Sequence, residues 1–447
     1  MARLRGVRVP HNKNTAMMSP APLPVPAQVT IPLSMNIGAP SKPVVKPGDH
    51  VDVGQLIAEA GGYVGAPIHA SVSGKVKKIA DVMQANGRYA QAVVIEADGE
   101  QTTAETVTPP TVTDRASFFE AVKQSGAVGL GGAAFPTMVK LNVKDLSTIK
   151  EVIVNGAECE PYITSDTRTM LDDAEYIAKG CKLLEEYMDI RTIMIGVEEN
   201  KPEAIAKMQE IAAKDEYVTV HKLPSIYPQG GEKVIIYNLT GKMVPEGKLP
   251  ADVGCIVINC TTLAFIAKYV ETGMPLVQKC VTVDGSAVEK RQNLLVPVGT
   301  AIKDVLDYVG LKCEPKKILL GGPMMGMAQF EMEAPVVKGT NAILAFDAKD
   351  AAEPETTACI RCGRCIDHCP LKLMPADIER AFEKKDGAAL EKLKVNLCME
   401  CGCCSFGCPA KRPLVQVNKL AKAMLRNWQA EQKAIEEAAK QKEVAVK

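Results

Sequence analysis

The spacing of hydrophobic positions divides the chain into segments of different type. After residue 112, stretches with an apolar residue every three or four positions alternate with short apolar runs, which predicts alternating helices and strands. Such alternation is typical of an α/β layer fold. The predicted helices cover residues 114–125, 172–188 and 201–213, and the predicted strands cover residues 151–155 and 191–197.

The chain before residue 112 follows another pattern. Five prolines fall between residues 20 and 32, so this start cannot be helical and is expected to run extended over a neighbouring surface. Valines then alternate with Pro-Gly-Asp and Ser-Gly turns in residues 44–57 and 66–76, which predicts short strands joined by tight turns. A linker rich in Thr and Pro, residues 102–113, ends this part.

The chain after residue 278 contains a smaller β-α-β pattern, a cysteine-rich region and a helical end. The small unit has strands predicted at 280–284, 292–299 and 317–320 around a helix at 301–309, and a separate compact domain is expected there. Residues 413–447 are predicted to form one long, increasingly charged helix.

Composition and charge narrow the classes of function. A chain of 447 residues is too long for one core and is expected to form three or four domains. The 53 basic and 53 acidic residues cancel, which argues against a nucleic-acid partner held by phosphate contacts. Residues 1–10 lack the apolar centre of a signal peptide, and polar residues interrupt the longest apolar stretch, 254–267, so neither export nor a membrane span is predicted.

Eight cysteines near the C-terminus form two runs with the same spacing, C-x2-C-x2-C-x3-C-P. This spacing is that of two-cluster bacterial ferredoxins, in which the fourth cysteine of each run binds the other cluster. A pair of zinc sites is the alternative, but zinc usually takes separated cysteine pairs or a mixture of Cys and His. The predicted [4Fe-4S] ligands are Cys359, Cys362, Cys365 and Cys408 for one cluster, and Cys398, Cys401, Cys404 and Cys369 for the other.

The other seven cysteines are expected to be ordinary thiols. Cys403 lies inside the second run, whose spacing is complete without it, and a packed thiol is predicted. The rest are scattered through apolar stretches, which favours buried, reduced thiols and a reducing compartment. They are Cys159, Cys181, Cys255, Cys260, Cys280 and Cys313.

A glycine-rich segment, residues 126–137, is the second candidate for chemistry. Its glycines let the backbone approach a ligand closely, and Pro136 suits the first turn of a helix. The segment alone is a weak signal, because a predicted helix precedes it and no G-x-G-x-x-G register is kept. An ordinary turn between helices is the alternative. Residues 154–162, Val-Asn-Gly-Ala-Glu-Cys-Glu-Pro-Tyr, form a second motif.

Together these two segments resemble the flavin- and NADH-binding subunit of respiratory complex I. Nearly the whole chain resembles the C subunit of the Rnf complex, the ferredoxin:NAD oxidoreductase of bacterial membranes. In that family a proline-rich start, a barrel-sandwich domain, the Gly-Gly-Ala-Ala-Phe-Pro-Thr loop, the Asn-Gly-Ala-Glu-Cys-Glu-Pro-Tyr motif and a two-cluster ferredoxin end occur in this order, as they do here.

The resemblance implies a multidomain α/β fold. The barrel-sandwich part lacks a lysine at a hairpin tip, where a swinging cofactor would be attached, so a docking or structural module is expected. The implied domains are a proline-rich start with a barrel-sandwich (biotinyl/lipoyl-like) domain at 1–105, a complex I flavoprotein-like FMN/NADH-binding α/β domain at 112–275, a β-grasp (SLBB-like) domain at 278–345, an α-helical two-[4Fe-4S] ferredoxin-like domain at 350–425 and a charged helical tail at 426–447.

The resemblance also implies roles for particular residues. A flavin would be lined by Gly129, Gly131, Gly132, Asn155, Glu158, Gly230, Gly231 and Glu232. The phosphate side would hold Lys140, Asn259 and Thr262, and the NADH side would hold Phe135 and Glu160. Phe135 could instead be a core residue, and the two glutamates could be surface carboxylates near a turn. Compared with complex I, this chain has Leu130, Ala157 and Val143 in place of an arginine, an aspartate and a phenylalanine, which weakens the inferred NADH contacts most.

The function implied is electron transfer between NAD(H), non-covalent FMN and two [4Fe-4S] clusters, within an ion-translocating membrane complex. No catalytic side chain is assigned, because the cofactors supply this chemistry. The expected partners are other subunits of the complex, and the expected location is peripheral, on the cytoplasmic side of the bacterial cell membrane. Two alternatives stay open here: a soluble flavin/iron-sulfur reductase such as a cobalamin reductase, and a cluster-bearing relay adaptor that does not bind nucleotide.

Overall fold

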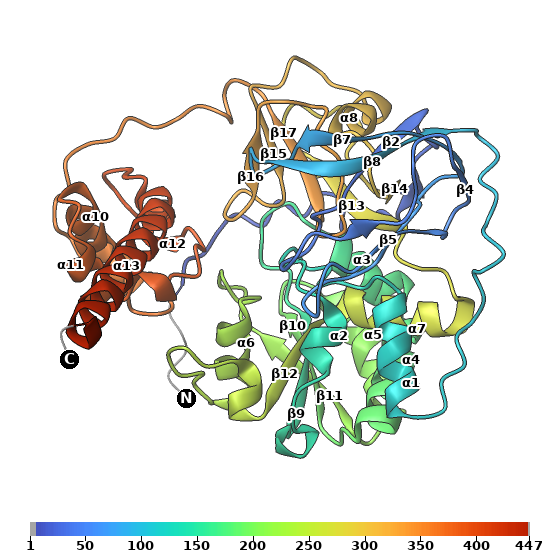
Figure 1. Ribbon diagram of the computed structural model, residues 1–447, viewed down its shortest axis with the longest axis horizontal. Helices are drawn as coiled ribbons and strands as arrows, with labels where there is room; N and C mark the ends of the chain where they lie inside the picture. Colours follow the sequence, from blue (N-terminus) through green and yellow to red (C-terminus); the bar gives the residue numbers. More distant parts are fainter. Residues whose placement is uncertain (1–5, 446–447) are drawn as a thin grey trace. The chain divides into compact units, whose positions relative to one another are not determined.

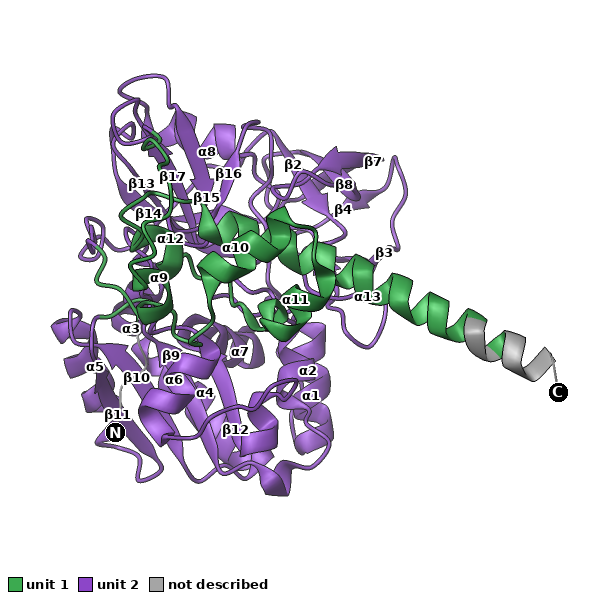
Figure 2. Cartoon of the chain, turned by 90° about the vertical axis from the view of Figure 1, so that its left-hand side faces the viewer, with its two compact units in different colours: residues 1–9, 226–228, 353–447 green, residues 10–225, 229–352 purple. Residues whose placement is uncertain are grey.

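The computed structural model describes residues 6–445 of the chain (Figure 1). The predictions made for residues 1–5 and 446–447 lie outside the described residues. The chain divides into two compact units (Figure 2), and each is described by itself. Within the described residues, unit 1 contains residues 6–9, 226–228 and 353–445, and unit 2 contains residues 10–225 and 229–352.

The N-terminal part of unit 2 consists of two small sheets around one core. Their strand orders are β2-β8-β7-β4 and β3-β5-β6. Fully buried residues from both sheets form a shared cluster: Ile57 and Ile68 lie in the segments where the valine pattern predicts strands, whereas Ile31 and Ile95 belong to β2 and β8, which the pattern did not predict. The strands are β2 (Gln28–Pro32), β3 (Lys42–Pro43), β4 (His50–Val51), β5 (Leu56–Glu59), β6 (Ile68–His69), β7 (Gly74–Met83) and β8 (Tyr89–Ala97).

A four-stranded parallel sheet forms the centre of unit 2. Its strands are β9 (Glu151–Gly156), β10 (Ile193–Glu198), β11 (Val218–Leu223) and β12 (Cys255–Asn259). The spatial order is β11-β10-β9-β12, so the chain reverses its direction of travel across the sheet between β9 and β12. Asn155 and Asn259 are register partners at the carboxyl ends of these two strands. In open α/β sheets a ligand binds in the crevice at this reversal point.

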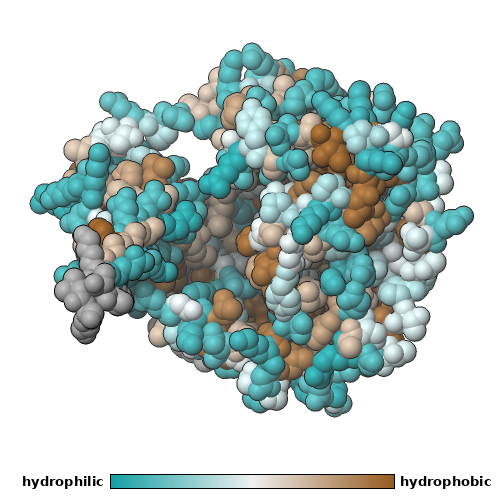
Figure 3. Space-filling model, in the orientation of Figure 1, coloured by the Kyte–Doolittle hydropathy of each residue, from teal (hydrophilic) through white to brown (hydrophobic). Residues whose placement is uncertain are grey.

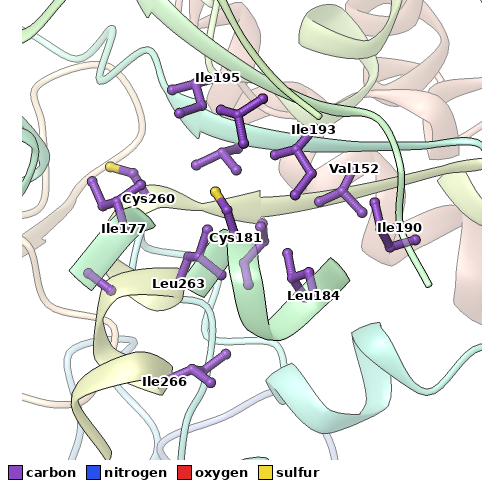
Figure 4. Packing of buried hydrophobic residues seen from close by; sticks show 14 of the residues in the cluster. Val152, Ile177, Cys181, Leu184, Ile190, Ile193, Ile195, Cys260, Leu263 and Ile266 are labelled. Atoms are coloured by element: carbon purple, nitrogen blue, oxygen red, sulfur yellow. The ribbon is translucent and has the colours of Figure 1, made fainter. Parts of the chain in front are cut away.

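Helices cover both faces of the parallel sheet. On one face Ile177, Cys181 and Leu184 of α4 pack with Leu263 and Ile266 of α7 against the strands (Figure 4). On the other face α6 packs against β9 and β12 through a smaller apolar cluster. The helices are α1 (Arg115–Gln124), α2 (Thr137–Leu141), α3 (Ser165–Asp172), α4 (Ala174–Met188), α5 (Pro202–Ala212), α6 (Glu232–Thr240) and α7 (Cys260–Thr272), with 3-10 turns η1 (Leu146–Thr148) and η2 (Pro250–Val253).

The helix predicted at 172–188 is in fact preceded by a second helix. α3 ends at Asp172 and α4 starts at Ala174, with Asp173 between them. Periodicity could not reveal α3, because its polar residues Ser165 to Thr169 are buried along with Met170. A helix that buries polar side chains has no apolar stripe for a sequence pattern to detect.

A six-stranded sheet follows, with strand order β1-β14-β13-β17-β15-β16. The predicted strand at 317–320 and the helix near 301–309 are confirmed. β1 comes from the proline-rich start and pairs in parallel with β14, which the sequence pattern did not predict. The elements are β1 (Ala21–Pro22), β13 (Gln278–Asp284), β14 (Gln292–Pro297), α8 (Ile302–Val309), β15 (Lys317–Leu320), β16 (Met327–Gln329) and β17 (Ala342–Phe346).

Unit 1 is helical around the two cysteine runs. Its apolar cluster includes Leu373, Ile378, Leu390 and Leu425, and the predicted long C-terminal helix is confirmed. A short bridge joins Val7 to Tyr227, so the segment 226–228 belongs to this unit. The elements are α9 (Arg364–Asp367), α10 (Pro375–Glu383), α11 (Gly387–Lys392), η3 (Val395–Leu397), α12 (Cys403–Phe406) and α13 (Leu414–Ala445).

The face of the molecule drawn in Figure 3 is largely polar. Figure 3 shows hydrophilic residues over most of one face, with apolar residues in separate patches. Within residues 6–445, no helix combines the length and the hydropathy that a membrane crossing requires.

Candidate functional site

The glycine-rich loop is closed on itself and attached to α7. The amide of Gly129 donates to the carbonyl of Phe135 at 2.8 Å, and the amide of Ala134 donates back to the carbonyl of Gly129 at 3.1 Å. The amide of Leu130 donates to the hydroxyl oxygen of Thr262 at 2.9 Å. Phe135 itself is half-buried. The loop is therefore held at the carboxyl end of β12, beside the reversal point of the sheet.

At two glycines of this loop, Gly131 and Gly132, the backbone is exposed and carries no side chain. A Cβ atom on Gly131 would lie 3.0 Å from Nδ2 of Asn259, and Gly132 has a φ of +115°, so neither position suits a side chain. Both residues are exposed. Asn259 caps α7 by accepting a hydrogen bond from the amide of Thr262 at 3.1 Å. Backbone without side chains beside a capped helix start fits a phosphate-bearing ligand.

A second glycine turn is fixed to the end of β9. Nδ2 of Asn155 donates to the carbonyl of Gly230 at 2.9 Å, and Oδ1 of Asn155 accepts from the amide of Ala157 at 3.1 Å. The amide of Gly230 donates to the sulfur of Cys159 at 3.3 Å. Gly231 directly precedes α6 as its N-cap. These bonds connect the two motifs that the sequence places 71 residues apart.

Lys140 and Glu232, both predicted site residues, form an ion pair with each other. The distance from Nζ to Oε1 is 2.6 Å, and the side chains are 30% and 40% exposed. A pair this exposed stabilises a protein by only about 0–1 kcal/mol. Lys140 can therefore exchange Glu232 for an anionic ligand at little cost.

Glu158 points its carboxylate at the start of α3. It accepts hydrogen bonds from the amide of Asp166 at 2.6 Å and from the hydroxyl of Thr167 at 2.5 Å. Burial raises the pKa of Glu158, and the nearby Lys13 ammonium opposes that rise. Glu158 also has a φ of +47°, so the chain bends sharply at this residue. The side chain anchors the loop after β9 to α3.

Glu160 reaches the turn between β15 and β16. Its two carboxylate oxygens accept hydrogen bonds from the amides of Met324, at 3.0 Å, and Met325, at 2.8 Å. A Cβ atom on Gly322 would lie 2.2 Å from the Glu160 carboxylate, so this turn requires glycine. The structure thus brings Glu160 to the Gly-Gly-Pro-Met-Met-Gly turn, and a contact with nicotinamide stays a prediction.

Three charged residues that support these loops were missed by the sequence reasoning. Nζ of Lys13 donates to the carbonyls of Glu158, Glu160 and Ile163. Nζ of Lys201 donates to the carbonyl of Ala157 at 2.7 Å, and Lys201 forms a fully buried ion pair with Glu198. Asp166 accepts hydrogen bonds from Asn259 and Thr261. None of them lies in a motif, so no local signal could have identified them.

The cysteine runs meet at a small cavity in unit 1. Its volume is about 20 Å³, and Cys369, Cys398, Cys401 and Cys404 line it together with Cys403. The fourth cysteine of the first run thus lies among those of the second. No three His, Cys, Asp or Glu side chains between residues 6 and 445 meet closely enough to hold a single metal ion. The thiols surround a space instead of meeting at a point.

The cysteines of the other predicted group are more exposed. Cys365 and Cys408 pack against Leu414 and Val415, while Cys359 and Cys362 are exposed. Cys408, the last cysteine of the second run, therefore lies beside a cysteine of the first. All fifteen cysteines of the chain lie within the described residues and are free thiols.

Burial disfavours the thiolate form of three of the cavity cysteines. It raises the pKa of Cys404 to about 12 and also raises the pKa of Cys369 and Cys398. The amide of Leu373 donates to the sulfur of Cys369 at 3.3 Å, and the amide of Glu400 donates to that of Cys398 at 3.4 Å. Such donors stabilise thiolates once a cluster is bound and help to set its potential.

The remaining cysteines agree with the prediction in most cases. Cys403 is fully buried, and its thiol donates to the carbonyl of Tyr227 at 3.7 Å. Cys181, Cys255 and Cys260 are buried as expected, and Cys159 and Cys280 are partly so. Cys313 is exposed, which corrects the prediction for that residue. It lies after α8 between Lys312 and Glu314, which are exposed as well.

The fold and these sites define a multidomain α/β oxidoreductase with an FMN-binding domain of the complex I type. Residues 122–268 match the family model described as the Nuo51 FMN-binding domain. Residues 2–100 match the model described as the RnfC barrel sandwich hybrid domain. The barrel-sandwich and flavin-binding parts of the fold prediction are thereby confirmed.

Curated relatives identify the family. The chain is 42% identical over 357 residues to the C subunit of the proton-translocating ferredoxin:NAD(+) oxidoreductase complex of Clostridium ljungdahlii, covering 79% of this chain and 78% of the relative. It is 39% identical over 425 residues to the C subunit of the Na(+)-translocating complex of Acetobacterium woodii, covering 93% and 95%. The chain belongs to the RnfC family, the C subunits of the Rnf ion-translocating ferredoxin:NAD(+) oxidoreductase complexes.

Solved structures give the same fold at lower identity. The NAD+-reducing [NiFe]-hydrogenase in the air-oxidized state aligns with a TM-score of 0.51 and 21% identity, over 73% of this chain and 66% of that chain. The H2-reduced state aligns with a TM-score of 0.50 and 20% identity, over 70% of this chain and 63% of that chain. This likeness supports the fold alone. The named relatives favour a complex subunit over the soluble reductase or the relay adaptor.

Proposed function

We propose that this chain exchanges electrons with NAD(H) through FMN and two [4Fe-4S] clusters, as the NADH-interacting subunit of an ion-translocating ferredoxin:NAD oxidoreductase complex. The observation that carries the proposal is the meeting of two glycine turns with Asn155 and Asn259 at the reversal point of the parallel sheet. That point is where open α/β sheets bind nucleotides. Flavin chemistry, when FMN is bound, converts two-electron transfer with NAD(H) into one-electron transfer.

The protein residues have distinct tasks in this proposal. Gly129, Gly131 and Gly132 give the flavin close access to backbone, and Gly230 and Gly231 do so from the second turn. Asn259, Thr262 and Lys140 hold the phosphate side, where Lys140 leaves Glu232 for the ligand. Asn155 and Glu158 set the position of the loop after β9 against the flavin. Phe135 and Glu160 face NADH.

The two clusters are proposed to be bound in the crossed grouping. Cys369 joins Cys398, Cys401 and Cys404, a choice supported by their shared cavity. Cys408 joins Cys359, Cys362 and Cys365, supported by the packing of Cys408 and Cys365 on the same apolar residues. Cluster binding releases the thiol protons, because only the thiolate is a ligand.

We also propose domain limits for the chain. We place the barrel-sandwich domain at 1–105, the FMN/NADH-binding domain at 112–275, a β-grasp (SLBB-like) domain at 278–345, a ferredoxin-like domain at 350–425 and the helical tail at 426–447. The six-stranded sheet with α8 supports the β-grasp assignment, although β1 is added to it from the N-terminal segment.

The relatives are named as subunits of ion-translocating complexes, so we propose other subunits of such a complex as partners. We place the chain on the cytoplasmic side of the cell membrane, where NAD(H) is available. Its attachment there is peripheral.

Cofactor content tests the proposal directly. The full chain is reconstituted anaerobically with iron, sulfide and FMN, and desalted. We expect one tightly held FMN and about eight iron atoms per chain, the content of two [4Fe-4S] clusters. A chain that retains iron but no flavin contradicts the NAD(H) function and favours the relay adaptor. The Cys313→Ser variant, altered at an exposed thiol, is the matched control for the cysteine variants described below.

A further inference from the structure

The proline-rich start contains a segment, residues 10–19, that runs along the loop after β9; we call it the N-terminal strap. The carbonyl of His11 accepts a hydrogen bond from the amide of Tyr162 at 3.0 Å. The hydroxyls of Thr15 and Thr164 are 2.5 Å apart and buried. Asn293 donates to the carbonyl of Thr15 at 3.0 Å. The strap is therefore bonded both to the loop and to the six-stranded sheet.

Lys13 is the strap residue with the most contacts to the loop. Its ammonium donates to the carbonyls of Glu158 at 2.8 Å, Glu160 at 2.8 Å and Ile163 at 2.6 Å. An ammonium has three N–H donors, so every donor of Lys13 has a carbonyl partner in one bend of chain. Three carbonyls that point at one cation fix the peptide planes of that bend.

Lys201 completes the support from the end of β10. Its ammonium donates to the carbonyl of Ala157 at 2.7 Å and pairs with Glu198 at 3.0 Å. Between them Lys13 and Lys201 bind four backbone carbonyls of residues 157–163. Burial lowers the pKa of Lys13 to about 8, opposed by the Glu158 carboxylate, so the ammonium keeps its proton at neutral pH.

The loop that these lysines support contains the residues expected to meet the flavin and NADH. It begins directly after Gly156, the last residue of β9, carries Glu158 and Glu160, and is bonded to the second glycine turn through Cys159. Its own backbone lacks the regular hydrogen bonds of a helix or strand, since β9 ends at Gly156 and α3 starts at Ser165. The shape of the loop depends on side chains from elsewhere in the chain.

We propose that Lys13 is a positioning residue for the flavin and NADH site, which holds residues 157–163 in the form that binds the nucleotide. This inference rests on the proposed function, because it assumes that FMN binds beside this loop. Lys13 acts through the backbone of the loop, without touching the cofactor. The N-terminal strap is then part of the site, although it lies more than a hundred positions away in sequence.

The test compares Lys13→Met with Asn14→Ala in the full chain. Asn14 bonds the strap to Asp284 at 3.0 Å, with no hydrogen bond to the loop, so its variant loosens the strap alone. For Lys13→Met we expect the FMN dissociation constant to rise about tenfold, and hydrogen exchange of residues 157–163 in the flavin-free protein to accelerate, because three charge-assisted bonds are lost. We expect Asn14→Ala to change FMN affinity by less than about twofold.

A conservative variant at position 13 distinguishes a role of Lys13 in positioning the loop from a general role in folding. Lys13→Arg keeps a cation with several donors, but a planar guanidinium matches three converging carbonyls less well than an ammonium does. We therefore expect the FMN affinity of Lys13→Arg to be intermediate between that of the wild type and that of Lys13→Met. Lys13→Gln replaces Lys13→Met if the latter does not fold, with the same expected direction.

The experiment distinguishes failure of the proposal for Lys13 from failure of the proposed function. Unchanged FMN affinity and unchanged exchange of residues 157–163 in Lys13→Met, beside a wild type that binds FMN, overturn the role of Lys13. A wild-type chain that binds no FMN overturns the proposed function instead.

Discussion

The two candidate sites differ in how far the protein alone forms them. In the α/β part of unit 2, predicted site residues already bond to one another, as in the pairs Asn155 with Gly230 and Lys140 with Glu232. In unit 1, four of the eight predicted ligands line one small cavity, whereas Cys359 and Cys362 are exposed. The residues of the proposed flavin site thus hold one another in place through their own hydrogen bonds, whereas the proposed cluster ligands would be connected to one another by the cluster.

The apolar core of the parallel sheet is also larger than the apolar core of unit 1. Within the described residues, the main cluster of the parallel sheet contains 26 buried residues, and the main cluster of unit 1 contains seven. Each buried aliphatic side chain stabilises a fold by about 1.5–3 kcal/mol, so the smaller core leaves unit 1 with less stability of its own. We therefore expect binding of the proposed clusters to contribute more to the folding of unit 1 than FMN binding contributes to the folding of the sheet.

The largest expected effect is the loss of one cluster. In Cys369→Ser we expect iron content to fall by about half, and the remaining electron paramagnetic resonance signal of the reduced protein to match that of Cys398→Ser, since both would bind the same cluster. Cys365→Ser should remove the other signal. A Cys369→Ser spectrum that matches Cys365→Ser contradicts the crossed grouping, and Cys313→Ser should leave both signals intact.

The next effect concerns the buried charges of the preformed site. Lys201→Met leaves Glu198 buried without its partner, and we expect the free energy of unfolding to fall by about 3–5 kcal/mol in urea denaturation. The double variant Lys201→Met/Glu198→Gln should recover part of that loss. Lys207→Met removes a surface pair with Glu210 and should change stability by less than about 1 kcal/mol. If Lys201→Met and Lys207→Met lowered the free energy of unfolding equally, the buried pair would contribute no more to stability than a surface pair.

A smaller effect is expected at the glycine loop. Gly131→Ala places a Cβ atom 3.0 Å from the Asn259 amide, so the loop must shift by a few tenths of an ångström. We expect FMN to bind several-fold more weakly in fluorescence titration, with about 1 kcal/mol lost from stability. Gly62→Ala, whose new atom would meet only Ala39 at 3.7 Å, is the control. Wild-type FMN affinity in Gly131→Ala would argue against close contact at this residue.

The smallest effect on stability is expected at Lys140. Because its pair with Glu232 is exposed, Lys140→Met should cost less than about 1 kcal/mol. Its effect on binding depends on the ligand, since only FMN carries a phosphate. We expect weaker binding of FMN and unchanged binding of riboflavin. A variant that weakens both ligands equally would place Lys140 away from the phosphate.

Sequence patterns predicted the parts of this protein that depend on local chemistry. The cysteine spacing identified the eight proposed ligands, because that signal lies in consecutive residues. The valine alternation indicated β4 to β6 and the start of β7 in the same way, but it missed β2 and β8. The pairing of β1 with β14 and the contact of Lys13 with the loop after β9 join segments more than a hundred residues apart. α3 was missed because it buries polar residues such as Asp166, which satisfy their hydrogen bonds through Asn259 and Thr261. Tertiary contacts of this kind leave no pattern in a single sequence.

The central claim is that one chain joins a nucleotide-binding flavin site to two iron-sulfur clusters. Anaerobic stopped-flow absorbance of the reconstituted chain after mixing with NADH tests it most directly. We predict rapid bleaching of the flavin band followed by slower loss of cluster absorbance, with the slow phase halved in amplitude in Cys369→Ser and unchanged in Cys313→Ser. Clusters that stay oxidised while the flavin is fully reduced would contradict the account.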